Sequence, residues 1–195
     1  MISSDYSQAF QCGVEAWSGF WGDPLFSGSL MMATYALAAV LVGRVALRVH
    51  GVERAAWGLA ALLLGFQVLN TPLDLHGLLW ATGRCLAHIQ GWYADRHAYQ
   101  RELLLMLALA GCVLLLLSLL VLWRDLLANG LLVTGLGLSL GMTLVKGINY
   151  HHLEALYAAA IGPLRVPDVI ELAGVACVLC AVLFKRRNPA VSLPE

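Results

Sequence analysis

Four long runs of uncharged, mostly apolar residues constrain this chain more than any other feature of its sequence. They occupy residues 24–43, 55–73, 103–123 and 126–145. A bilayer core needs roughly 20 such residues in a helix, so each run predicts a membrane span. A fifth run, residues 172–184, reaches that length only when the helix begins at Pro167, and proline suits the first turn of a helix.

The composition agrees with a polytopic membrane protein. Hydrophobic residues make up 60% of the 195 residues and charged residues only 12%. Soluble domains, in contrast, are about one quarter charged. Twelve Lys and Arg balance twelve Asp and Glu, so the chain has no basic field that could follow a phosphate backbone. We therefore expect the lipid bilayer as a partner and exclude nucleic acid.

The resulting prediction is an all-α fold, a single membrane domain over residues 1–195. The five transmembrane helices are expected at about residues 24–46, 55–73, 103–123, 127–149 and 167–185. Gly137 and Gly141 give the fourth of them a G-x-x-x-G pattern, which permits close approach of another helix. Packing within the chain is the favoured use of this small-residue face, and dimerisation is the alternative.

Residues 74–101 are too long for an ordinary connection between the second and third spans. Polar or small residues recur there at helical spacing, at Asp74, Gly77, Ala81, Arg84, His88, Gly91 and Asp95. This spacing predicts an amphipathic helix over about residues 74–98. Aromatic residues of the segment would lie at the level of the lipid headgroups. We expect this helix to cap one end of the bundle.

The same segment carries a resemblance. Its most specific part is Gln90-Gly91-Trp92-Tyr93 with Arg96 and Gln100, preceded by Asp74-Leu75 and Gly83-Arg84. These residues resemble the motif D-L-Q, G-R, Q-G-W-Y-x-x-R-x-x-x-Q of a family of small uncharacterised bacterial inner-membrane proteins. His76 stands where that motif has Gln. Residues 149–156 and 164–174 resemble two later motifs, with departures at Glu154 and Asp168. The resemblance implies a multi-span fold and no particular activity.

The placement of Lys and Arg predicts the orientation. One side of the five spans carries Arg44, Arg48, Arg54, Arg124, Lys185, Arg186 and Arg187. The other side carries Arg84, Arg96, Arg101 and Arg165, with Lys146 near a helix end, and residues 1–27 add no basic residue. The positive-inside rule then places the N-terminus in the periplasm and the C-terminus in the cytoplasm of a bacterial inner membrane. On the cytoplasmic face we expect only simple basic anchors, whereas the amphipathic helix caps the periplasmic end.

Charged and aromatic side chains gather toward the periplasmic side. Charges at membrane depth are costly, so they usually pair or serve a function. Arginine holds carboxylate or phosphate groups with two parallel hydrogen bonds. We therefore expect an anion-binding set that comprises Arg84, His88, Trp92, Tyr93, Arg96, Gln100, Lys146 and Glu171. Within this set, Lys146 and Glu171 are expected to pair across the fourth and fifth spans.

His151, His152 and Glu154 are the candidate acid–base residues or metal ligands. On a helix, His151 and Glu154 share a face while the adjacent histidines diverge. A zinc site needs three or four ligands, so the sequence leaves a metal or haem cofactor open. We expect the amphipathic helix to fold over the outer ends of the fourth and fifth spans and to join both sets into one site.

Cys12 and Cys85 would both face the oxidising periplasm, where disulfides persist. Sequence shows no distance between them, so a disulfide between these two cysteines is an open alternative.

Two classes of function follow. The first is a non-catalytic subunit or assembly factor whose periplasmic polar face docks another membrane or periplasmic protein. The small size of the chain and its lack of a catalytic sequence motif favour this class. The second is a membrane-embedded enzyme, or a metal- or haem-binding protein, that acts on a lipid or another anionic substrate.

Overall fold

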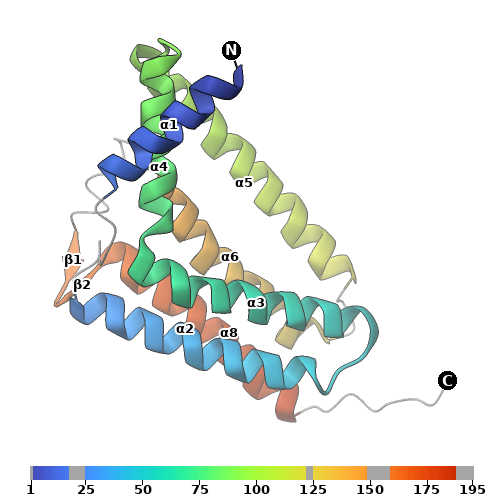
Figure 1. Ribbon diagram of the computed structural model, residues 1–195. Helices are drawn as coiled ribbons and strands as arrows, with labels where there is room; N and C mark the ends of the chain where they lie inside the picture. Colours follow the sequence, from blue (N-terminus) through green and yellow to red (C-terminus); the bar gives the residue numbers. More distant parts are fainter. Residues whose placement is uncertain (1, 18–24, 122–124, 149–158, 188–195) are drawn as a thin grey trace.

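The computed structural model describes residues 2–17, 25–121, 125–148 and 159–187 (Figure 1). The helices are α1 (Ile2–Ala16), α2 (Leu25–Ala46), α3 (Gly51–Leu73), α4 (Leu75–Ile89), the 3₁₀ turn η1 (Tyr93–Asp95), α5 (Arg96–Val121), α6 (Leu126–Ile148) and α8 (Val166–Arg187). Strands β1 (Ala160–Ile161) and β2 (Leu164–Arg165) form a short antiparallel hairpin, with Ala160 opposite Arg165.

Five of the described helices are long and apolar enough to cross a membrane. They are Phe26–Ala46, Gly51–Leu73, Tyr93–Ser118, Leu126–Lys146 and Val166–Arg187. The predicted all-α fold with five spans and a separate amphipathic helix is thus confirmed. The amphipathic helix is shorter than residues 74–98, because Gly91 adopts a positive φ of 79° and ends it. Residues 96–98 belong to α5 instead, which begins before the expected position 103.

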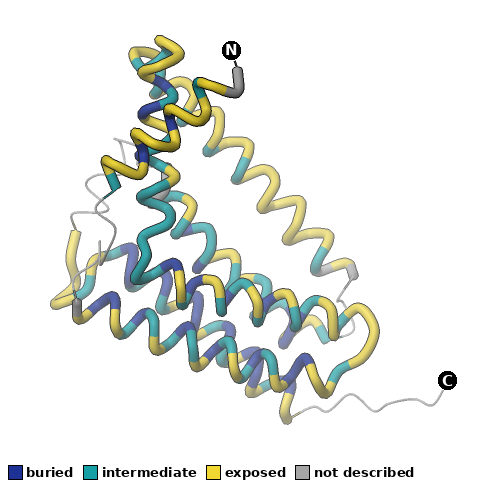
Figure 2. Tube along the Cα trace, in the orientation of Figure 1, coloured by how far each residue is buried: buried dark blue, intermediate teal, exposed yellow. Residues whose placement is uncertain are grey.

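Helices α2, α3, α6 and α8 pack around one apolar core. Trp57, Tyr35 and Leu64 are its largest side chains and are fully buried. Helix α5 stands apart from this bundle: no residue of its membrane-span window is buried, and Figure 2 shows it almost wholly exposed. A leucine-rich helix with so little protein around it is suited to contact with lipid.

Close contact between α6 and α8 depends on two glycines. A Cβ atom added at Gly174 would lie 2.7 Å from the carbonyl oxygen of Gly135, and one at Gly135 would lie 2.5 Å from that of Gly174. Gly137 and Gly141, which the sequence pattern favoured, have no atom within 4 Å of such a Cβ. The prediction of a small-residue contact on this helix was right, but it named the wrong face.

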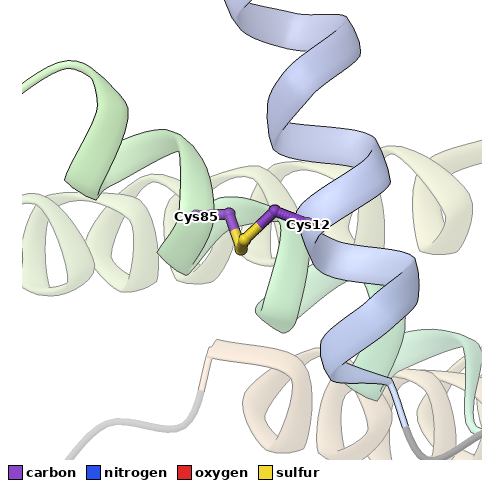
Figure 3. The surroundings of a disulfide bond; sticks show 2 residues. All are labelled: Cys12 and Cys85. Carbon is purple, nitrogen blue, oxygen red and sulfur yellow. A yellow bond between two sulfur atoms is a disulfide. The ribbon is translucent and has the colours of Figure 1, made fainter.

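Helix α1 packs across α4 and is joined to it by a disulfide between Cys12 and Cys85 (Figure 3). No long apolar run marks this helix in the sequence, and it was not predicted. A Cβ atom at Gly13 would lie 2.7 Å from Cα of Thr82, so the two backbones touch. Trp17 adds a hydrogen bond from its indole nitrogen to the carbonyl oxygen of Asp74, 3.1 Å away.

The end of the bundle near Lys185 contains an ion-pair cluster in which Lys185 is buried and its carboxylate partners are half-buried. Lys185 lies 2.9 Å from Glu53 and 2.9 Å from Asp125. Asn129 donates a hydrogen bond to Glu53 and accepts one from Trp57, each at 3.0 Å. The expectation of simple basic anchors on this face is wrong for Lys185, because nearby carboxylates draw it inward to tie α3, α6 and α8 together.

Candidate functional site

A cavity of about 880 Å³ lies beneath α4, between α3, α5 and α6. The chain connections explain why it is there. Helix α4 has 15 residues and rises about 22 Å between the end of α3 and the approach to α5. At its other end, α5 finishes at Val121, only five residues before α6 begins at Leu126. Helix α5 is therefore held away from the bundle on the α4 side, as Figure 1 shows.

Two arginines stand at the α4 and α5 side of this cavity. The guanidinium of Arg96 lies 4.3 Å from the ring centre of Tyr93, and its Nη1 donates to the Tyr93 carbonyl at 3.2 Å. Arg84 lies 5.5 Å from the ring centre of Trp80 and 5.9 Å from that of Tyr93. Within the described residues, neither guanidinium has a carboxylate partner. Stacking on a ring leaves the edge of a guanidinium available to an anion.

The other residues of the predicted anion-binding set divide between the cavity and its surroundings. Trp92, Tyr93 and Gln100 line the cavity together with the two arginines. His88 is not among the lining residues, although its ring stacks on Tyr93 with 3.8 Å between the ring centres. The structure thus brings five of the eight predicted residues to one cavity: Arg84, Trp92, Tyr93, Arg96 and Gln100.

The rest of the cavity wall is mostly apolar. Helices α3, α4, α5 and α6 contribute Phe66, Leu75, Leu79, Leu103, Leu107 and Leu144. A cationic, aromatic end joined to apolar walls matches a molecule with an anionic head and a hydrocarbon body.

A chain of polar groups begins at the cavity wall, where Asn70 and Thr143 are exposed to it. Asn70 donates to Gln67 at 3.2 Å, and Gln67 donates to the Thr143 hydroxyl at 2.6 Å. Thr143 in turn donates to the backbone carbonyl of Ser139. Sequence reasoning missed these residues, although their spacing of three and four along two spans was an available signal.

The chain continues to a buried ion pair. The Ser139 and Tyr35 hydroxyls are 2.8 Å apart, and Tyr35 donates to Glu171 at 2.9 Å. Lys146 lies 2.7 Å from the other Glu171 oxygen and 3.4 Å from Asp168. The predicted pairing of Lys146 with Glu171 is confirmed. These residues do not line the cavity. The two sets of hydrogen bonds meet at Ser139, through its backbone carbonyl on the cavity side and its hydroxyl on the side of the ion pair.

His76 is a further polar group of the cavity wall, fixed by its neighbour Asp74. Its Nε2 lies 3.1 Å from the Asp74 carboxylate. Asp74 adopts the left-handed conformation, with φ of 47°, and its carboxylate caps α4 by accepting the Gly77 N–H at 3.2 Å. One residue thus ends α3, begins α4 and orients the imidazole.

The predicted catalytic or metal-ligating residues His151, His152 and Glu154 lie outside the described residues. Among the residues that the structure describes, no group of three or more His, Cys, Asp or Glu side chains could hold a metal ion. Comparisons of the chain with protein families, with curated proteins and with solved structures find no match. The functional conclusion therefore rests on the chemistry of the cavity.

Proposed function

We propose that this polytopic membrane protein binds an amphiphile with an anionic headgroup in the cavity beneath α4. The observation that carries the proposal is the position of Arg84 and Arg96, unpaired with any described carboxylate, at one side of an apolar cavity between candidate spans. Arg84 is exposed and Arg96 is half-buried, and a lipid phosphate would supply both with the anionic partner that the described residues do not.

The surroundings of the two arginines support a lipid rather than a small soluble anion. Trp80, Trp92 and Tyr93 give this end the aromatic composition of a headgroup region. The leucines of α4 and α5 would lie along the acyl chains. Such a ligand suits the second class of function from the sequence, a membrane-embedded protein that acts on a lipid. It is also compatible with the first class, because a non-catalytic subunit can hold a lipid as a structural ligand.

We further propose that the cavity lies on the periplasmic side of a bacterial inner membrane. The Cys12–Cys85 disulfide supports this orientation, because such bonds persist in oxidising compartments. The excess of basic residues at the opposite end of the bundle supports it as well.

Removing one cavity arginine should selectively weaken binding of anionic lipid. In Arg84→Gln, we expect phosphatidylglycerol to bind about 10- to 100-fold more weakly, the worth of a hydrogen bond between charged groups. Arg84→Lys should be intermediate because it keeps the charge but loses the planar fork. Native mass spectrometry of protein titrated with phosphatidylglycerol or phosphatidylcholine measures both affinities.

Arg101→Gln is the matched control for this measurement, since Arg101 is exposed, lies on α5 and is not part of the cavity wall. Equal affinity for the anionic and the zwitterionic lipid in the unaltered protein would refute the proposed function.

Thiol labelling should place α4 and the C-terminus on opposite sides of the membrane. With Cys112, Cys177 and Cys180 replaced by Ser, we expect a cysteine at Asp95 to react with an impermeant maleimide added to intact cells. A cysteine at Ser192 should react only after the cells are opened. The reverse pattern would invert the proposed orientation.

A further inference from the structure

The contact between α1 and α4 is made of small residues. From α1 it buries Ala9 and Gly13, and on α4 it buries Ala81 and Cys85, which lie one helical turn apart. Such side chains remove little apolar surface from water, so packing adds little stabilisation. The larger apolar side chains of α1 face away from the contact: Tyr6 and Phe10 are each 54% exposed.

A helix as short as α1 has little stability of its own. It has 15 residues, and isolated helices of roughly 12–15 residues are marginal in water. Its described links to α4 besides the small-residue packing are the Trp17 hydrogen bond and the disulfide. The covalent bond is therefore the main restraint that keeps α1 on α4.

The two cysteine residues of this bond differ in exposure. Cys12 is an exposed residue of α1, whereas Cys85 is 8% exposed within α4 (Figure 3). Thiol–disulfide exchange depends on access to the sulfur that is attacked. Because Cys12 is the exposed residue of the pair, it is the expected point of attack, with Cys85 as the leaving thiolate.

We propose that Cys12–Cys85 is a thiol–disulfide exchange site, at which a protein dithiol of the thioredoxin class releases α1 from α4. In the first step a partner thiolate attacks Sγ of Cys12, and Cys85 leaves as a thiolate that takes up a proton. The second partner thiol then attacks the mixed disulfide and frees Cys12. The partner dithiol is oxidised to a disulfide, and the two electrons reduce Cys12 and Cys85 to thiols.

Release of α1 would affect the cavity because α4 contacts both. The disulfide residue Cys85 directly follows Arg84, and the face of α4 that lines the cavity carries Trp80, Gly83, Arg84 and Ala87. Helix α1 is the main neighbour that α4 packs against. Without it, α4 loses much of its support, and a smaller fraction of molecules holds Arg84 in place. This link to ligand affinity rests on the proposed function, whereas the release of α1 does not.

Hydrogen exchange of the full chain in lipid nanodiscs tests the release without any added ligand. After treatment with a reduced thioredoxin-class protein, we expect amides of α1 to exchange at least about tenfold faster, as for a helix that has lost its packing. Amides in the core of α2, α6 and α8 should keep their rates. A Cys12→Ser/Cys85→Ser variant should show the fast rates without reductant and should not respond to it.

A variant with Ser at Cys112, Cys177 and Cys180 is the matched control, because it loses the three described free thiols but keeps the disulfide. It should respond to the dithiol protein as the unaltered chain does. Slow exchange in α1 after complete reduction would overturn the proposal, because packing alone would then hold the helix. Reduction by dithiothreitol but not by the dithiol protein would also overturn it, since the disulfide would then be purely structural.

The second measurement is the affinity for phosphatidylglycerol before and after reduction. We expect binding to weaken in proportion to the fraction of molecules whose α4 has lost its binding geometry. Faster exchange in α1 with unchanged affinity would refute the link to the cavity. No binding by the oxidised protein would refute the proposed function, while the exchange rates of α1 would still decide whether the disulfide releases it.

Discussion

Replacing Lys146 by Met should destabilise the bundle by about 3–5 kcal/mol, the cost of leaving a buried charge without its partner. Lys146 is the described cation nearest to two carboxylates, Asp168 and Glu171, which are 1% and 4% exposed. Methionine preserves most of the volume of lysine, so the loss would report on charge rather than on packing. The free energy of unfolding in mixed micelles of dodecyl sulfate and a mild detergent measures it.

Glu171→Gln should cost less than Lys146→Met, because Lys146 keeps Asp168 as a partner and the amide can still bond to Tyr35. The double variant should be more stable than the sum of the two single losses predicts, since it removes both members of a coupled pair. Arg186→Met is the control: Arg186 is an exposed basic residue on the same helix, α8. Strict additivity of the two single losses would show that the pair carries no coupling.

The features that sequence predicts well here follow from the length of an apolar run or from the cost of a charge within one. The length of an apolar run fixes a span, because the thickness of the bilayer is constant. The pairing of Lys146 with Glu171 follows from the high cost of either charge alone at membrane depth. Arg84 and Arg96 were selected because the planar fork of arginine suits an anionic group, and Tyr93 because aromatic residues favour the level of the lipid headgroups.

The features that sequence misses are those that depend on how helices are turned relative to each other. A basic residue after a span is typical of a cytoplasmic anchor, yet Lys185 turns inward because it meets Glu53 of α3 and Asp125, which directly precedes α6. Asn70 and Thr143 belong to the cavity wall only because α3 and α6 present them to the same space. No run of residues in a single segment encodes either arrangement.

Helix α1 and its disulfide were only partly predictable from the sequence. Two cysteines on the same predicted side made the bond an open alternative, but their distance depends on the packing of α1 across α4. Gly13 allows this packing, because any side chain there would meet the backbone of Thr82. The sequence around Gly13 does not indicate that another backbone packs against this glycine.

Replacing glycines by alanine should change the stability of the bundle in opposite directions, depending on which face of α6 carries the glycine. Gly174→Ala and Gly135→Ala should each destabilise the bundle by about 3 kcal/mol, the upper part of the usual range for overpacking. The added methyl group meets backbone atoms of the facing helix, which cannot rotate away as a side chain can. Gly137→Ala and Gly141→Ala fill open space and should stabilise α6 by about 0.5–1 kcal/mol, the ordinary gain of alanine over glycine in a helix. Unfolding in mixed micelles compares all four variants, and a loss of stability at Gly137 or Gly141 equal to that at Gly135 would mean that α6 presents a different face to α8.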